Sequence, residues 1–190
     1  MVVEIVAGFV ALVLAVLLVA YVVSIYNGLV SLRRRVEQSK QNIDVLLKQR
    51  QDELEKLIDT AREFMDHEES VLVQLTEARE AAERARAPDE LAAADQQVRQ
   101  ALADFRARVE DYPELRSQSN MMQLQQRIAD LESQIADRRE FYNEAVTQYN
   151  TRIHQFPYLI FARQFGFQEA NLFTASEAET ADVDVGAAFG

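Results

Sequence analysis

The sequence contains no cysteine, only three prolines and only five glycines among its 190 residues. Without cysteine it can form no disulfide, no thiolate zinc site and no cysteine nucleophile. Proline and glycine are the residues that most often interrupt regular structure, so their scarcity predicts an almost entirely helical chain. Lysine occurs only at positions 40, 48 and 56, and the formal net charge is −11. This acidity fits either a salt-loving organism or an arginine-rich genome, and a chain without a basic face is not expected to bind nucleic acid.

Charge is absent from one long stretch, Ile5 to Leu32, of which Ile5 to Ile25 is nearly continuous Val, Leu, Ala and Ile. About 20 such residues suffice to cross the ~30 Å hydrocarbon layer of a bilayer. A cleaved signal peptide is the competing interpretation. However, the segment begins with Glu4 in place of basic residues, exceeds the usual apolar length and has no A-x-A cleavage site. Residues 1–28 are therefore predicted to be a transmembrane anchor in the lipid bilayer.

Basic residues follow the anchor at once, whereas the other flank offers only the terminal amine. Under the positive-inside rule this asymmetry predicts a single-pass protein of the cell membrane, with its N-terminus outside and the larger C-terminal portion in the cytoplasm. The apolar span from Ile5 to Ile25 contains no charged side chain, so it offers no ion or proton pathway of its own. The basic residues concerned are Arg33, Arg34, Arg35, Lys40, Lys48 and Arg50.

Apolar residues after the anchor recur in steps of three and four, which is the spacing of one face of a helix. The first series stops before Pro88, where proline and two acids suit the first turn of a new helix, and the second stops at Pro113. The third stops before Pro157. The series are Leu29, Leu32, Val36, Ile43, Leu46, Leu54, Leu57, Ala61, Phe64, Leu72, Leu75 and Ala82; Leu91, Val98, Leu102, Phe105 and Val109; and Met121, Leu124, Ile128, Leu131, Ile135, Tyr142, Ala145, Tyr149, Ile153 and Phe156.

The expected lengths of the helices indicate how many helices the bundle contains. A single rod over residues 29–86 would rise about 87 Å, and the short second helix could not descend that far. Asp66 and Glu69 form a D-x-x-E variant of the capping box that could start a helix there and lets the chain return to the membrane. The prediction is an all-α fold in which the transmembrane helix precedes an antiparallel up-and-down four-helix bundle, residues 29–168. A long kinked helical hairpin is the alternative, and the acidic residues 169–190 are predicted to be a disordered tail.

A Tyr-Asn pair occurs three times, and the copies at 142 and 149 lie seven residues apart, so that both tyrosines face one direction. In the bundle, Asn143 and Asn150 are expected to face the region of Asn27 and Asn42. There a buried Asn would fix the helix register and Tyr would fill the core. The alternative is a polar, aromatic-lined groove for a partner segment. The candidate residues for register or interaction are Tyr26, Asn27, Asn42, Asp44, His67, Glu68, Arg79, Tyr142, Asn143, Tyr149 and Asn150.

The segment FPYLIFARQFGF, residues 156–167, is too short to span a bilayer and too apolar to be left in water. It could lie in the lipid headgroup region or cap the end of the bundle, and these two interpretations stay open. The membrane-interface candidates are Tyr158, Phe161, Arg163, Phe165 and Phe167.

Catalytic patterns are missing. A metal-carboxylate site in a helical bundle needs Glu-x-x-His, but Phe64 precedes His67 by three residues and Thr151 precedes His154. The sequence also lacks H-E-x-x-H, a glycine-rich phosphate loop and G-x-S-x-G. We therefore expect no enzyme activity, no metal and no cofactor, and we interpret His67-Glu68 as a helix-start or interhelical hydrogen-bonding pair.

Six segments resemble the LemA family in order and spacing: YNGLVSLRRRV, NIDVLLKQR, HEESVLVQLTEAR, YPELRSQSN, LQQRIADLESQI and FYNEAVTQYNTRIHQFP followed by GF. The resemblance covers about residues 26–173 and implies a prokaryotic single-pass membrane protein with an antiparallel helical bundle. Two positions depart from the family pattern. Ser39-Lys40-Gln41 replaces Ala-Trp-Ser, and Leu54-Glu55-Lys56 replaces Ile-Pro-Asn, so no proline kink is expected in the first helix.

Family members are often encoded beside HtpX-type membrane metalloproteases, and one relative belongs to the magnetosome apparatus. The resemblance therefore implies an accessory membrane protein. The leading hypothesis is a non-enzymatic adaptor or scaffold that assists another membrane protein, such as an HtpX-type protease. The second hypothesis is a homo-oligomer, a self-assembling structural protein that organises membrane.

Overall fold

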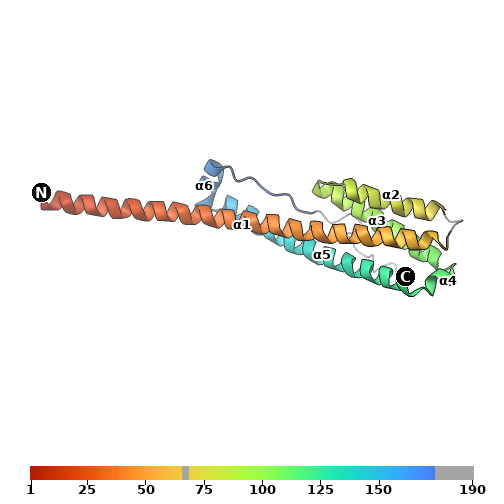
Figure 1. The fold of residues 1–190 in the computed structure, drawn as a ribbon. Coiled ribbons are helices and arrows are strands. Elements are labelled where there is room, and N and C mark those ends of the chain that lie inside the picture. Colours follow the sequence, from red (N-terminus) through yellow and green to blue (C-terminus); the bar gives the residue numbers. More distant parts are fainter. Residues whose placement is uncertain (66–68, 174–190) are drawn as a thin grey trace, which may run out of the picture. The chain divides into compact units, whose positions relative to one another are not determined.

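The computed structural model describes residues 1–65 and 69–173, which form helices and no strand (Figure 1). The predicted all-α class is confirmed. The helices are α1 (Val2–Arg62), α2 (Glu69–Arg84), α3 (Pro88–Val109), α4 (Pro113–Arg116), α5 (Ser119–His154) and α6 (Tyr158–Phe165).

The helix ends follow the local sequence signals. At the start of α3 the Glu90 carboxylate accepts hydrogen bonds from the main-chain N–H groups of Arg86 (3.0 Å) and Ala87 (3.1 Å). These bonds lower the pKa of Glu90 below its ordinary value and satisfy donors that the helix leaves unpaired. Pro113 begins α4, where its missing N–H costs nothing.

The break between α1 and α2 excludes the continuous helix that the hairpin alternative requires over residues 29–86. The first helix ends at Arg62 and the next begins at Glu69. The capping box expected at residue 66 lies outside the described residues. Through Leu54 and Glu55, where the family usually has proline, the helix continues without interruption.

The chain divides into two compact units, each of which contains parts of α1 and α5. The first unit holds residues 1–41 and 141–171. Within it, residues 1–24 are exposed apart from half-buried Val22, whereas Ile25 and Leu29 are buried and mark the start of the packed region. From α5, Tyr142, Val146, Tyr149 and Ile153 fill this core, together with Ala162 of α6.

The second unit holds residues 42–140 and, among the described residues, 172–173. In it α2 packs against α3, and ion pairs connect α3 with both α1 and α5. Most of the predicted apolar series are buried here, including Leu54, Leu75 and Phe105. The buried apolar residues of this unit are Ile43, Leu47, Leu54, Leu57, Ile58, Ala61, Met65, Val71, Leu72, Leu75, Ala78, Ala82, Ala85, Leu91, Ala94, Val98, Ala101, Leu102, Phe105, Val109, Leu115, Met121, Leu124, Ile128, Leu131, Ile135 and Phe173.

Two expectations about the C-terminal part need correction. Phe156, predicted as the last core residue of its series, is 83% exposed, because α5 ends at His154 and the chain has already left the helix face. The predicted disordered tail, residues 169–190, begins too early. Ala170 and Asn171 form hydrogen bonds with α5 and Phe173 is buried, while residues 174–190 lie outside the described residues.

Candidate interaction sites

Three residues of the two Tyr-Asn pairs of α5, namely Tyr142, Tyr149 and Asn150, bind the extended segment that follows α6. The Tyr142 hydroxyl donates to the main-chain oxygen of Asn171 and the Tyr149 hydroxyl to that of Gln168, both at 2.8 Å. The Asn150 amide donates to the Ala170 carbonyl at 2.9 Å, and its oxygen accepts the Ala170 N–H at 3.0 Å. Asn150 thus satisfies both main-chain groups of one residue, as a neighbouring β-strand would. We call residues 168–171 the docked segment.

Burial strengthens these contacts. It raises the pKa of the Tyr142 phenol, and it raises that of Tyr149 although the nearby Arg33 charge acts in the opposite direction. A raised pKa keeps both hydroxyl groups protonated, and therefore able to donate, beyond their ordinary range. The seven-residue spacing brought both tyrosines to one face as predicted, and both are buried.

The partner of Asn150 differs from the expectation. It was expected to face α1 near Asn27, but its amide pairs with Ala170, while Asn27 is exposed. The docked segment has no apolar periodicity, so no pattern in the sequence marks it as the tyrosines' partner. His154 adds a contact at the end of α5: its Nδ1 lies 2.8 Å from the Asn150 carbonyl, and its Nε2 lies 3.0 Å from the Glu169 carboxylate.

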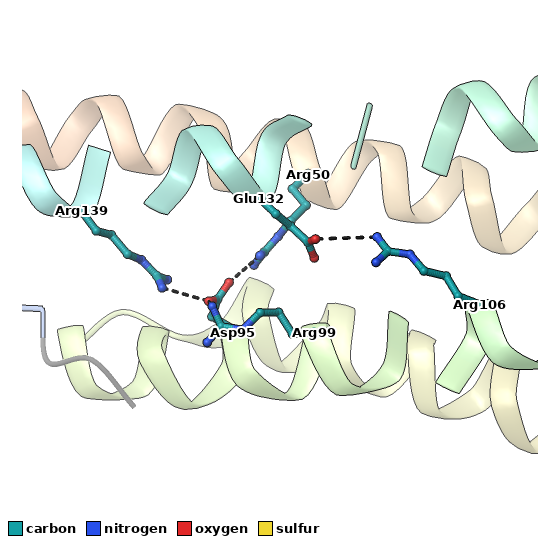
Figure 2. Close-up of polar contacts among 6 residues, drawn as sticks. All are labelled: Arg50, Asp95, Arg99, Arg106, Glu132 and Arg139. Atoms are coloured by element: carbon teal, nitrogen blue, oxygen red, sulfur yellow. Dashed lines mark hydrogen bonds and ion pairs between the residues drawn. The ribbon is translucent and has the colours of Figure 1, made fainter. Parts of the chain in front are cut away.

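A second cluster, in the other unit, was not predicted. Asp95 of α3 is 2% exposed and contacts three arginines from three helices (Figure 2). Arg50 of α1, also 2% exposed, donates to one of its carboxylate oxygens. The other oxygen lies 2.9 Å from the guanidinium groups of both Arg99 and Arg139. We call these four residues the Asp95 cluster.

The Asp95 cluster carries more positive than negative charge. Burial alone would raise the pKa of Asp95, but the charges of Arg50, Arg139 and Arg99 and the hydrogen bond from Arg50 outweigh it and lower the pKa. Among the described residues, Arg50 Nε and Arg139 Nε and Nη2 are buried without a hydrogen-bond partner. Arg50 and Arg139 are therefore each tied to Asp95 by only part of the guanidinium group. Replacing a buried pair of this kind by well-packed apolar residues often costs no stability, whereas removing one partner alone is strongly destabilising.

The sequence did contain a signal for this cluster. Arg50 stands at a core position between Leu47 and Leu54, Asp95 lies four residues after Leu91, and Arg139 lies four residues after Ile135. Arg50 was interpreted only as one of the basic residues that follow the anchor. A charged residue on an apolar helix face, in phase with its neighbours, is the pattern that would have identified it.

Helices α2 and α3 line a groove of about 410 Å³. Its lining includes two buried alanines, Ala78 and Ala101, and five exposed polar side chains. These are Gln74, Glu77, Gln97, Gln100 and Asp104. Both charged groups are acidic, so the groove suits a segment that carries basic and hydrogen-bonding side chains.

The remaining register candidates have separate environments. Asn42 and Asp44 are exposed, and Asn143 is half-buried. Arg79 of α2 lies 3.6 Å from the Glu55 carboxylate of α1, an ion pair at the surface of the second unit. His67 and Glu68 lie outside the described residues.

Two of the predicted membrane-interface residues, Phe165 and Phe167, contact Tyr26. The ring centroids of Phe165 and Phe167 lie 5.1 and 6.0 Å from that of Tyr26, in edge-on geometry. Tyr158 is half-buried under the Arg152 guanidinium, 4.8 Å from its ring centroid. Phe161 and Phe167 are half-buried, Phe165 is 47% exposed and Arg163 is exposed. In the described part of the chain, no three His, Asp or Glu side chains are grouped as metal ligands would be.

These features define an all-helical protein with one helix, α1, whose N-terminal part is long and apolar enough to cross a membrane. The model of the LemA family matches residues 39–186, most of the chain. The protein therefore belongs to the LemA family, as the sequence resemblance predicted. A comparison with the curated proteins finds no match.

Proposed function

We propose that this LemA family protein is a membrane-anchored, non-enzymatic adaptor or scaffold. Residues 1–28 would form the anchor, with the N-terminus outside the cell and the helices that follow in the cytoplasm. We further propose that residues 29–168 form an antiparallel up-and-down four-helix bundle. The short connections at 63–68 and 85–87 and the ion pairs of α3 with α1 and α5 support this arrangement.

Membrane anchoring rests on the first part of α1. The most apolar stretch of α1 is entirely unburied within the structure, whereas the core helix of a soluble protein would be mostly buried. Exposed Val, Leu and Ile over this length favour a lipid environment. The three arginines that follow at 33–35 favour the cytoplasmic orientation of the remainder.

The observation that carries the adaptor proposal is the α2–α3 groove. Its two alanines allow close approach of another backbone, and its glutamines and acids can hydrogen-bond to a partner's side chains. The proposed occupant is a segment of another membrane protein with arginine or lysine among its contacts. An HtpX-type protease is the candidate that the family resemblance provides.

Affinity purification of the full chain in mild detergent tests this proposal. Glu77→Arg combined with Asp104→Arg reverses the charge of the groove, and Asp130→Arg combined with Asp137→Arg makes the same change on exposed positions of α5. The adaptor proposal predicts a second membrane protein that is lost with the groove variant and retained with the control. Recovery of the chain alone would contradict it. A large homo-oligomer would instead favour self-assembly.

A further inference from the structure

Large apolar side chains are exposed between the end of α5 and the end of α6. Phe156 is 83% exposed, Ile160 58% and Phe165 47%. Three such side chains within ten residues are unusual for a surface in contact with water and indicate an interaction surface. On the same helix, Ala162 is buried and Phe161 is half-buried, so α6 also has a face that caps the core of its unit.

The position of α6 along α1 indicates what the exposed side chains contact. Through Phe165 and the adjoining Phe167, α6 and the turn after it pack against Tyr26 of α1 (Figure 1). Tyr26 precedes the first arginine, Arg33, by about 10 Å of helix. The uncharged stretch from Ile5 to Leu32 rises about 42 Å, which exceeds the ~30 Å hydrocarbon layer. The excess places Tyr26, and α6 with it, at the boundary between hydrocarbon and headgroups.

The charges near α6 suit a lipid surface. Arg163 is exposed in its last turn, and Arg152 lies over the Tyr158 ring. Arg34 and Arg35 are exposed on α1, and Arg33 pairs with Glu37 at 3.2 Å. Arginine beside exposed apolar and aromatic side chains is typical of helices that lie in the headgroup layer of anionic membranes.

We propose that Phe156 and the Ile160 side of α6 insert into the cytoplasmic headgroup layer as a second membrane contact, beside the point where α1 leaves the bilayer. The opposite side carries Phe161, Ala162 and Phe165; it caps the unit, and its Phe165 packs against Tyr26. Both interpretations of residues 156–167 therefore apply, each to a different face. The proposal rests on the proposed anchor, because the position of α1 places α6 at the membrane surface.

The absence of tryptophan from the chain permits a direct test. The single-tryptophan variants Phe156→Trp and Ile160→Trp each place one fluorescent side chain on the proposed membrane contact. Phe141→Trp is the matched control, because Phe141 is 55% exposed on α5 in the same unit. Leu17→Trp reports whether the anchor lies within the bilayer. Each full-length variant is reconstituted into bilayers of phosphatidylcholine and phosphatidylglycerol, with and without brominated acyl chains, and its fluorescence is measured.

We expect brominated lipid to quench tryptophan at 156 and 160 several-fold more strongly than at 141, with emission shifted to shorter wavelength, and to quench position 17 most. Quenching at 17 alone would overturn the second contact and leave the anchor intact. Equal quenching at 141 and 160 would also overturn it. Absence of quenching at 17 would refute the anchor, so the failure of each proposal is separately visible.

Discussion

Three arginines surround the single carboxylate of Asp95 (Figure 2). Loss of this carboxylate would leave three positive charges without the negative charge that they share. With the carboxylate gone, Arg50 would keep its charge at 2% exposure without a negative charge to balance it. We expect Asp95→Asn to lower the free energy of unfolding by about 3–5 kcal/mol, measured by urea denaturation.

Removal of both charges tests the cause of that loss. In Arg50→Met combined with Asp95→Leu, the most buried arginine no longer needs a partner, so we expect less destabilisation than in Asp95→Asn alone. Greater destabilisation of the double variant would show that packing, and not the stranded charge, controls stability at this position.

Acid should weaken the same cluster. The pKa of Asp95 is lower in the folded protein than its ordinary value of 3.8. The ionised carboxylate therefore contributes fully to the free energy of unfolding above pH 3.8, and this contribution is lost as the pH falls toward the folded-state pKa. Urea unfolding at several pH values between about 6 and 2 should therefore show a steeper loss of stability in the wild-type protein than in Asp95→Asn. Parallel curves would contradict the lowered pKa.

Asn150 contributes through the docked segment, where it makes two hydrogen bonds to Ala170. Asn150→Ala removes both hydrogen bonds, each of which contributes about 0.5–1.5 kcal/mol. Residues 168–171 should therefore separate from α5 more often, and their amide hydrogen exchange should increase. Gln148→Ala is the control, because this exposed side chain bonds only locally, to Glu144 on the same helix. Equal protection in both variants would mean that other contacts hold the segment.

At the scale of elements, α1 shows that the resemblance to the family does not extend to its proline. Glu55 stands where the family usually has proline, and here the helix is uninterrupted. We expect Glu55→Pro to destabilise the protein by about 3 kcal/mol or more, because proline removes a helical hydrogen bond and its ring clashes with the preceding turn.

The control for this variant is Glu55→Ala, which removes only the surface contact with Arg79. Its effect on the free energy of unfolding should stay within about 0.5 kcal/mol. Circular dichroism during thermal unfolding measures both changes. If Glu55→Pro were as stable as Glu55→Ala, α1 would tolerate the bend found in the family.

The helices were predictable because their signals are local. Pro88 with its adjacent acids marks a start, and spacings of three and four identified Leu54, Phe105 and Ile128 as core residues. The contacts of Asn150 and Asp95 were not predictable in this way. Asn150 and Ala170 are 20 positions apart, and Arg50 and Asp95 are 45 apart. The partner of Asn150 is also main chain, which carries no residue-type signal.

At the scale of the whole molecule, topology is the most direct prediction. The arginines at 33–35 lie within the region that normally sets orientation, so a reporter fused to the C-terminus should be active only in the cytoplasm. Alkaline phosphatase and a fluorescent protein, fused separately, would measure this. Phosphatase activity outside the cell would reverse the proposed orientation and exclude a cytoplasmic partner.

The docked segment also has an evolutionary consequence. Because α5 contacts the main chain of residues 168, 170 and 171, most side chains could replace Gln168 or Asn171 without loss of a hydrogen bond. Proline at 170 is the exception, since it would remove the N–H that Asn150 accepts. Related chains should therefore vary freely along this segment and exclude proline at that one position, while Tyr142, Tyr149 and Asn150 stay unchanged.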